Sequence, residues 1–218
     1  MALEAVVFDV GETLVNEGRQ WSEWAHWLGI SSGTFFAGLG AVIARRQDHR
    51  AVFDLFRPGF DFDKERKAKE AAGRGWSVGA QDLYPDAVGC LAALRDHGLR
   101  VGIAGNQPAG IEQALGALGL PVDFVASSAR WGVAKPSPAF FERVVEAAGV
   151  APPGIAYVGD RIDNDVVPAR AAGMTAVFLR RGPWGWIQAG WPEAAAADVV
   201  VDSLTELPDR LFSVIGPA

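Results

Sequence analysis

The chain is poor in the residues that build disulfide-rich, metal-thiolate or membrane-spanning proteins. Of its 218 residues, one is cysteine (Cys90) and three are histidine. A single cysteine excludes an intramolecular disulfide and fits a reducing compartment. No apolar run reaches membrane-spanning length, and no signal-peptide pattern opens the sequence. We therefore expect a cytoplasmic protein with no membrane partner.

The residues that are abundant indicate a globular protein. Half of them are hydrophobic, 21% are charged, and the formal net charge is -6. This composition excludes a disordered chain, and the negative charge argues against a nucleic-acid partner. The length suits one good core and a small second module.

From residue 83 onward, strand-like and helix-like segments alternate. The predicted strands are short apolar runs bounded by turn residues, at 99–104, 123–126, 155–158, 175–179 and 198–201. The predicted helices carry apolar faces at helical spacing, at 85–96, 107–118, 137–148 and 165–172. With a first strand that ends just before Asp9, this alternation predicts an α/β fold. The expected architecture is a Rossmann-like parallel sheet flanked by helices.

Residues 17–81 interrupt this alternation. They contain no convincing strand, and helices are predicted at 21–28, 34–46 and 63–72. We expect a discontinuous core domain of residues 1–16 and 82–218, with a helical cap domain at 17–81. An insert that directly follows the first strand is a candidate lid over the end of that strand.

Four charged residues occupy the places where a parallel sheet exposes its ligand-binding edge. Asp9 ends the first apolar strand, and Asp160 ends another. Asp165 follows five residues later near a helix start, and Lys135 lies in a proline-flanked loop that enters a helix. Because the carboxyl ends of parallel strands meet at one edge, we expect these side chains to converge.

Converging carboxylates repel one another unless a cation holds them together. Oxygen ligands without histidine or cysteine favour Mg²⁺, which also accepts phosphate oxygens from a substrate. A nearby lysine neutralises further negative charge. A carboxylate nucleophile beside Mg²⁺ and a lysine is the chemistry of an aspartyl-phosphate intermediate.

Four motifs in this order resemble those of the haloacid dehalogenase-like (HAD) superfamily, over nearly the whole chain. The first, D-x-D-x-T, falls on residues 9–13, and the second, an apolar strand that ends in Ser or Thr, falls on residues 101–105. The lysine of the third motif matches Lys135, in the typical K-P-x-P setting. The fourth, G-D-x-x-x-x-D, is matched in full by residues 159–165. The helical insert is similar to the small α-helical cap of that family.

The resemblance implies a Mg²⁺-dependent hydrolase that acts on a small phosphorylated metabolite through an aspartyl-phosphate on Asp9. It implies that Lys135 bridges this nucleophile and the phosphate. The implied metal ligands are two aspartates, a backbone carbonyl and a fourth carboxylate that binds directly or through water: Asp9, Asp160, Gly11 and Asp165. The implied phosphate contacts come from Gly105 and Asn106.

Two positions depart from the family pattern. Gly11 stands where most family phosphatases have a second aspartate, a general acid/base of a kind that contributes roughly 10²–10⁴-fold in rate. Glu12 is the candidate replacement. Gly105 stands where a Ser or Thr hydroxyl usually binds phosphate, so backbone N–H groups and the Asn106 side chain would have to compensate. Two alternatives therefore remain open: a hydrolase of another bond, such as C–P, and a non-catalytic protein that binds a ligand or partner.

Overall fold

The computed structural model describes residues 2–215, and within them six strands form one parallel sheet in the order β3-β2-β1-β4-β5-β6. Every neighbouring pair of strands is parallel. The strands are β1 (Ala5–Phe8), β2 (Arg100–Gly105), β3 (Phe124–Ser127), β4 (Ile155–Gly159), β5 (Thr175–Leu179) and β6 (Val199–Val201). The predicted α/β class with a Rossmann-like parallel sheet is confirmed.

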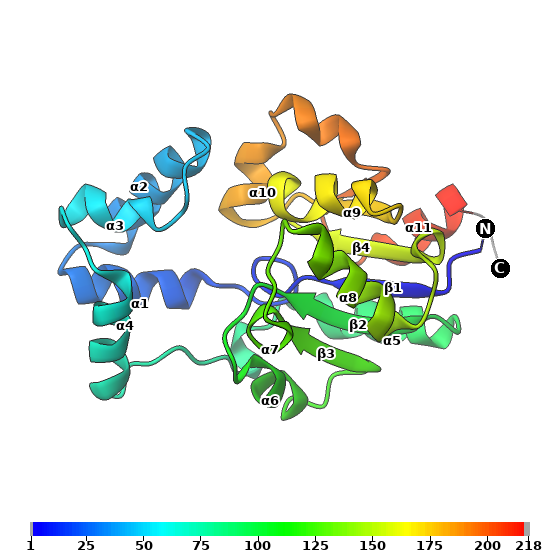
Figure 1. Ribbon diagram of the computed structural model, residues 1–218, viewed down its shortest axis with the longest axis horizontal. Coiled ribbons are helices and arrows are strands. Elements are labelled where there is room, and N and C mark those ends of the chain that lie inside the picture. Colours follow the sequence, from blue (N-terminus) through cyan, green and yellow to red (C-terminus); the bar gives the residue numbers. More distant parts are fainter. Residues whose placement is uncertain (1, 216–218) are drawn as a thin grey trace. The chain divides into compact units, whose positions relative to one another are not determined.

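Helices cover both faces of this sheet, and β1 lies at its centre between β2 and β4 (Figure 1). Helices α8 (Pro138–Ala148) and α9 (Val167–Ala171) pack on one face, where Ala5 and Val7 belong to the hydrophobic cluster. Helices α5 (Ala87–Asp96) and α11 (Leu207–Ile215) lie on the other face. All four β1 side chains are buried, as a strand covered on both sides requires.

The helix boundaries differ from the predicted ones where glycine or proline intervenes. The helix predicted at 107–118 is shorter, because α6 (Ile111–Gly116) begins only after Gly110, whose φ is 123°. The helix predicted at 165–172 starts earlier, as a π-helix over Ile162–Val166 that continues into α9. The remaining helical segments of the core are α7 (Ser128–Trp131), α10 (Gly182–Gln188), and 3-10 turns at Ala80–Asp82, Pro152–Gly154 and Pro192–Ala196.

The chain separates into two compact units. Glu17–Val78 forms one, here called the helical unit, and the remainder forms the other, the core unit. The helical unit contains α1 (Gly18–Leu28), α2 (Ser32–Ala44), α3 (Ala51–Phe56) and α4 (Phe62–Ala71). Its interior is aromatic: the ring centroid of Trp24 lies 5.0 Å from that of Phe53 and 5.2 Å from that of Phe62. Such ring pairs stabilise a small unit beyond the area they bury.

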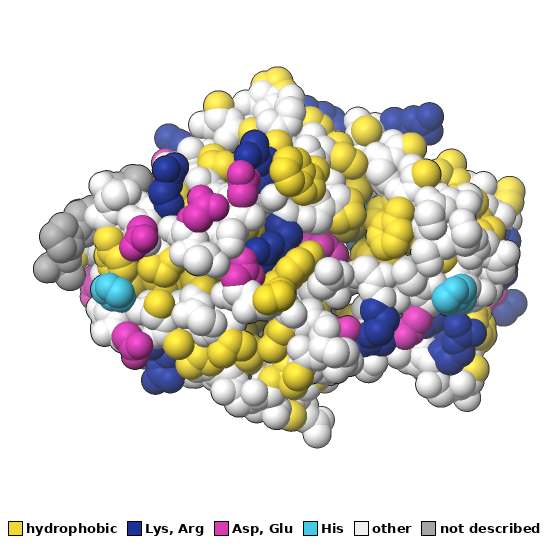
Figure 2. All heavy atoms as spheres, turned by 180° about the vertical axis from the view of Figure 1, so that it is seen from behind, with side chains coloured by type: hydrophobic (Ala, Val, Ile, Leu, Met, Phe, Trp, Pro, Cys, Tyr) yellow, Lys and Arg dark blue, Asp and Glu magenta, His cyan; other side chains and the backbone are white. Residues whose placement is uncertain are grey.

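Charges of both signs are interspersed on the surface face drawn in Figure 2, with hydrophobic side chains between them. Surface ion pairs of the core unit include Arg180–Asp202 at 2.6 Å and Arg170–Asp198 at 3.1 Å. Among residues 2–215 no single helix is long and apolar enough to cross a membrane; α1 and α2 together, bent by 108°, pass that test by length and composition only.

Candidate functional site

Asp9 stands at the carboxyl end of the central strand. Its backbone N–H donates to the Val158 carbonyl at 2.8 Å, so the pairing of β1 with β4 continues one residue beyond the strand. Asp160 follows the adjacent strand β4 directly, and both aspartates are buried. The sheet therefore brings two carboxylates to one edge, where open α/β folds bind ligands.

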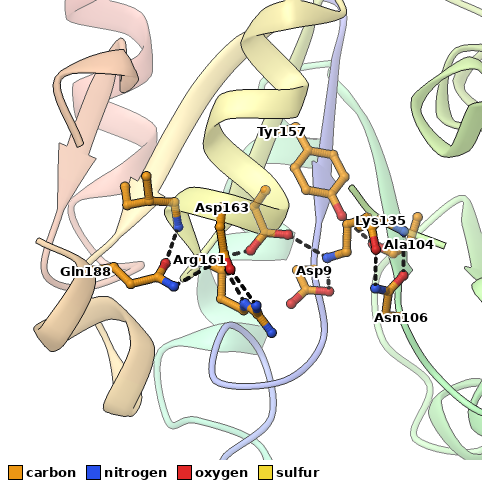
Figure 3. Close-up of polar contacts among 10 residues, drawn as sticks. Asp9, Ala104, Asn106, Lys135, Tyr157, Arg161, Asp163 and Gln188 are labelled. Carbon is orange, nitrogen blue, oxygen red and sulfur yellow. Dashed lines mark hydrogen bonds and ion pairs between the residues drawn. The ribbon is translucent and has the colours of Figure 1, made fainter. Parts of the chain in front are cut away.

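Lys135 and Asp165 reach the same place from other elements. Lys135 precedes α8, which begins with Pro138 in its first turn. Asp165 lies on the π-helix, a geometry that is frequent at functional sites. The Lys135 Nζ donates to Asp9 Oδ1 at 2.7 Å and to Asp165 Oδ1 at 2.5 Å (Figure 3). With Asp160, the four residues expected to converge do lie together.

The Lys135 ammonium is held as a cation. Only 2% of its side chain is exposed, and burial alone lowers the pKa of Lys135, but the charges of Asp165 and Asp9 outweigh burial and hold it well above its usual value. Asp165 is itself fixed, because its Oδ2 accepts the backbone N–H of Arg161 at 3.0 Å. The nucleophile candidate Asp9 therefore has a permanent positive charge against one oxygen.

The three carboxylates fit a divalent cation. Asp9, Asp160 and Asp165 each offer an oxygen, and these atoms lie within 4.8 Å of one another. Asp160 Oδ2 is buried without a hydrogen-bond partner in the described part of the chain. Burial, and then the charges of Asp165 and Asp9, raise the pKa of Asp160 well above its usual value. A buried carboxylate in this state requires a cation for its ionised form, and an all-oxygen set suits Mg²⁺.

The two positions predicted to bind phosphate lie directly against this cluster. A Cβ on Gly105 would stand 2.3 Å from Asp9 Oδ1, so the glycine makes room for the carboxylate. The Asn106 side chain contacts the main chain of Lys135 twice: its Oδ1 accepts the Lys135 N–H at 2.8 Å and its Nδ2 donates to the Lys135 carbonyl at 2.9 Å (Figure 3). The side chain of Asn106 is thus engaged with the protein.

Glu12 follows Gly11 in the tight loop after Asp9. Its φ of 52° is uncommon for a residue other than glycine. Its carboxylate is buried, with Oε2 accepting the Tyr84 O–H at 2.6 Å, and a Cβ on Gly182 would lie 2.5 Å from the same oxygen. Glu12 is therefore lodged between Tyr84 and Gly182, and its role as acid/base stays a prediction.

Two features of the site have no signal in the sequence. Gln188, from α10, is buried and ties down the segment after β4: its Oε1 accepts the Ile162 N–H at 2.6 Å and its Nε2 donates to Asp163 Oδ1 at 3.0 Å. Arg161 donates to both oxygens of Asp163, at 3.1 and 2.7 Å (Figure 3). The other feature is Tyr157 of β4, whose ring centroid lies 5.4 Å from the Lys135 Nζ. In the sequence Tyr157 is one apolar residue of a predicted strand among others.

Comparison with known proteins agrees with this geometry. The sequence model described as haloacid dehalogenase-like hydrolase matches residues 3–173. The glyceraldehyde 3-phosphate phosphatase of Methanopyrus kandleri is 30% identical over an alignment of 235 positions, which covers 98% of this chain and 97% of that protein. The phosphoserine phosphatase of Thermus thermophilus is 40% identical over an alignment of 104 positions, which covers 46% of this chain and 41% of that protein.

Solved structures agree in fold. The crystal structure of a HAD phosphatase from Thermococcus onnurineus superposes with a TM-score of 0.60 at 26% identity, and the match covers 99% of both chains. An L-2-haloacid dehalogenase from Xanthobacter autotrophicus gives a TM-score of 0.65 at 24% identity, covering 95% of this chain and 97% of that one. The matched sequence model and the relative aligned over almost its whole length show the family: the chain belongs to the haloacid dehalogenase-like hydrolases.

Proposed function

We propose that the protein is a Mg²⁺-dependent phosphatase that hydrolyses a small phosphorylated metabolite through an aspartyl-phosphate on Asp9. The observation that carries the proposal is the position of the Lys135 ammonium, 2.7 Å from Asp9 Oδ1 and 2.5 Å from Asp165 Oδ1. It is supported by Asp160, whose buried Oδ2 has no partner among the described residues. Two relatives named as phosphatases of small phosphomonoesters support the substrate class.

In this mechanism an Asp9 carboxylate oxygen attacks phosphorus, and the bond from phosphorus to the leaving oxygen breaks. Lys135 lies where negative charge develops on the nucleophile and the transferring group. Backbone N–H groups of Gly105 and Asn106 donate to the phosphoryl oxygens. Water then attacks the aspartyl-phosphate, which releases inorganic phosphate and restores the Asp9 carboxylate. Glu12 is the candidate that protonates the leaving oxygen and accepts the proton of water.

The cation would be held by Asp9, Asp160 and the Gly11 carbonyl, with Asp165 binding directly or through water. Bound there, Mg²⁺ supplies positive charge that stabilises the transferring phosphoryl group. Asp165 contributes in a second way, because it accepts a hydrogen bond from Lys135 and so fixes the ammonium beside the nucleophile.

We also propose that the helical unit acts as the cap domain and selects the substrate. It carries aromatic and charged side chains in a separate compact unit, inserted immediately after the loop that holds Asp9. Substitutions of exposed residues in this unit are then expected to change KM and the order of preferred substrates while leaving Mg²⁺ dependence unchanged.

The experiment is a panel of phosphomonoesters that includes glyceraldehyde 3-phosphate, phosphoserine and phosphoglycolate, assayed for phosphate release with Mg²⁺ and with EDTA. Asp9→Asn is the test variant, and Asp96→Asn, at an exposed position on α5, is the matched control. We expect chelator-sensitive release by the wild type, a loss of about 10³-fold or more in Asp9→Asn, and no change in Asp96→Asn.

Two other results would redirect the proposal. Release of phosphate from phosphonates but not from phosphate esters would favour a hydrolase of the C–P bond. Absence of turnover on the whole panel, with ligands still raising the melting temperature, would favour a non-catalytic binding protein.

A further inference from the structure

The position of the Lys135 ammonium must be set by its surroundings. A lysine side chain has four rotatable carbon–carbon bonds, so burial between two carboxylates does not by itself select one geometry. A displacement of about 1 Å at a reacting centre can lower a rate by roughly 10²-fold. Groups other than Asp9 and Asp165 that contact Lys135 and fix its position therefore affect the rate of the reaction.

Tyr157 contacts the charged end of Lys135. The ammonium lies over the Tyr157 ring, with Nζ 5.4 Å from the ring centroid, within the range of a cation–π interaction. The ring is held at its far end, because the Tyr157 O–H donates to the Ala104 carbonyl of β2 at 2.7 Å (Figure 3). Phe141 packs edge-on against the ring at 5.3 Å between centroids. The ring is thus fixed on two sides before it meets the lysine.

Asn106 contacts the other end of Lys135. Its two hydrogen bonds, at 2.8 and 2.9 Å, bind both the N–H and the carbonyl of the Lys135 main chain. Asn106 follows Ala104 by two residues, so one short segment at the end of β2 anchors the Tyr157 hydroxyl and the Lys135 backbone together. Asp9 directly follows β1, which pairs with β2. Lys135 is held by Asn106 at the end of the same strand β2.

We propose that Tyr157 and Asn106 are positioning residues that together fix the Lys135 ammonium against Asp9, Tyr157 at the side chain and Asn106 at the main chain. The kinetic consequence rests on the proposed phosphatase activity, whereas the structural consequence does not. Neither side chain touches the reacting atoms in this scheme, and both side chains act through Lys135.

The direct test is an NMR measurement of lysine ammonium groups. The chain has four lysines, which are Lys64, Lys67, Lys69 and Lys135. In ¹⁵N-lysine-labelled full-length protein, a buried and hydrogen-bonded ammonium exchanges its protons slowly and gives an Nζ signal. Lys135→Met assigns that signal by its loss. Lys69, buried in the helical unit with Glu23 at 3.0 Å, is the internal reference.

The variants separate positioning from loss of core packing. Tyr157→Leu removes the ring, and Tyr157→Phe keeps the ring and removes only the hydroxyl. The control Phe178→Leu makes a similar truncation in the same hydrophobic cluster, on β5. We expect Tyr157→Leu to broaden the Lys135 signal and to leave that of Lys69 unchanged. Tyr157→Phe is expected to keep most of the signal, and Phe178→Leu to keep all of it.

Kinetics on the best panel substrate give the second measurement. Tyr157→Leu and Asn106→Ala are each expected to lower kcat by about 10- to 100-fold with KM changed less than threefold, while Phe178→Leu stays near wild type. In a Lys135→Met background the same substitutions should have no further effect on kcat, because the group on which they act is gone.

The outcomes are decisive even if one variant does not fold. Asn106 is exposed, so Asn106→Ala leaves the core intact and tests the main-chain contact alone. An unchanged Lys135 signal in both Tyr157→Leu and Asn106→Ala, or equal kcat losses in Tyr157→Leu and Phe178→Leu, would overturn the proposal. Absence of wild-type turnover would refute the phosphatase proposal and leave the NMR result to decide the positioning.

Discussion

Replacing Gly105 with alanine should inactivate the site by displacing its nucleophile. A Cβ at this position would lie 2.3 Å from Asp9 Oδ1, whereas ordinary van der Waals contacts begin at 3.4 Å. The same Cβ would already be 3.4 Å from the backbone nitrogen and Cγ2 of Val10, so it cannot retreat toward that side. The carboxylate must therefore move by about 1 Å, in a core that is closely packed.

The displaced atom is the one that accepts the hydrogen bond from Lys135 at 2.7 Å. A shift of this size at a reacting group corresponds to a loss of roughly 10²-fold in rate. The cost in stability is of the order of 1–3 kcal/mol, as for other overpacked positions. Gly105→Ala should thus lose far more activity than its melting temperature suggests.

The assay compares kcat/KM and the free energy of unfolding for Gly105→Ala, Gly105→Ser and a matched control, Gly89→Ala. Gly89 lies within α5, and a Cβ there would meet nothing within 4 Å, so this control should keep its activity and gain about 0.5–1 kcal/mol of stability. The family pattern places Ser or Thr at position 105 and so predicts improved phosphate binding for Gly105→Ser. The geometry predicts a loss, and a rise in kcat/KM for Gly105→Ser would refute the steric reasoning.

Three further predictions test other parts of the core unit. Asp160→Asn should abolish the rise in melting temperature that Mg²⁺ gives the wild type, and an undiminished rise would show that Asp160 is not a ligand. Burial raises the pKa of Asp86, but hydrogen bonds from Arg181 and Ser203 outweigh burial and hold this pKa below its usual value. The contribution of Asp86 to stability is therefore present above about pH 4 and lost below it. Asp86→Asn should destabilise the protein at pH 7, and urea titrations should show the difference in stability from the wild type closing as the pH falls. Burial raises the pKa of the Cys90 thiol to about 12, so iodoacetamide at pH 8 should label the native protein about 10³-fold more slowly than the unfolded chain.

Much of the site follows from the strand ends alone. Asp9 and Asp160 each follow an apolar run, and parallel pairing of β1 with β4 obliges their backbones to be neighbours. Lys135 lies in the loop between α7 and α8, and Asp165 lies on the π-helix that follows β4. A predicted parallel sheet already places these residues at one edge. Their convergence can therefore be predicted from the sequence without knowledge of side-chain packing.

Side-chain direction could not be predicted in the same way. Tyr157 and Gln188 lie outside the motifs, and their roles depend on register and on helix packing that no local pattern encodes. The π-helix is a similar case: the spacing predicts a helix start at Asp165, but it does not predict that Arg161 donates to Asp165 or that Ile162 donates to Gln188. Sequence spacing gives the order of such groups along the chain and leaves their contacts undetermined.

Glu12 shows why an acidic residue next to the expected acid/base position does not establish a role. Its left-handed backbone, at φ 52°, directs a buried carboxylate to Tyr84, and Tyr84 in turn has the Arg181 guanidinium 4.1 Å from its ring centroid. A general acid must present its proton to the leaving oxygen. The hydrogen bond from Tyr84 gives the same carboxylate a second use, which is to hold the loop.

Glu12→Gln and Tyr84→Phe separate these two uses. If Glu12 transfers protons, Glu12→Gln should lower kcat by roughly 10²–10⁴-fold while Tyr84→Phe, which keeps the carboxylate, remains active. If Glu12 holds the loop, both variants should lower the melting temperature together and keep turnover within a few-fold of wild type. Because the Glu12–Tyr84 hydrogen bond is 2.6 Å long, the second result would assign the Glu12 carboxylate to holding the loop and would leave the acid/base of the reaction to another group.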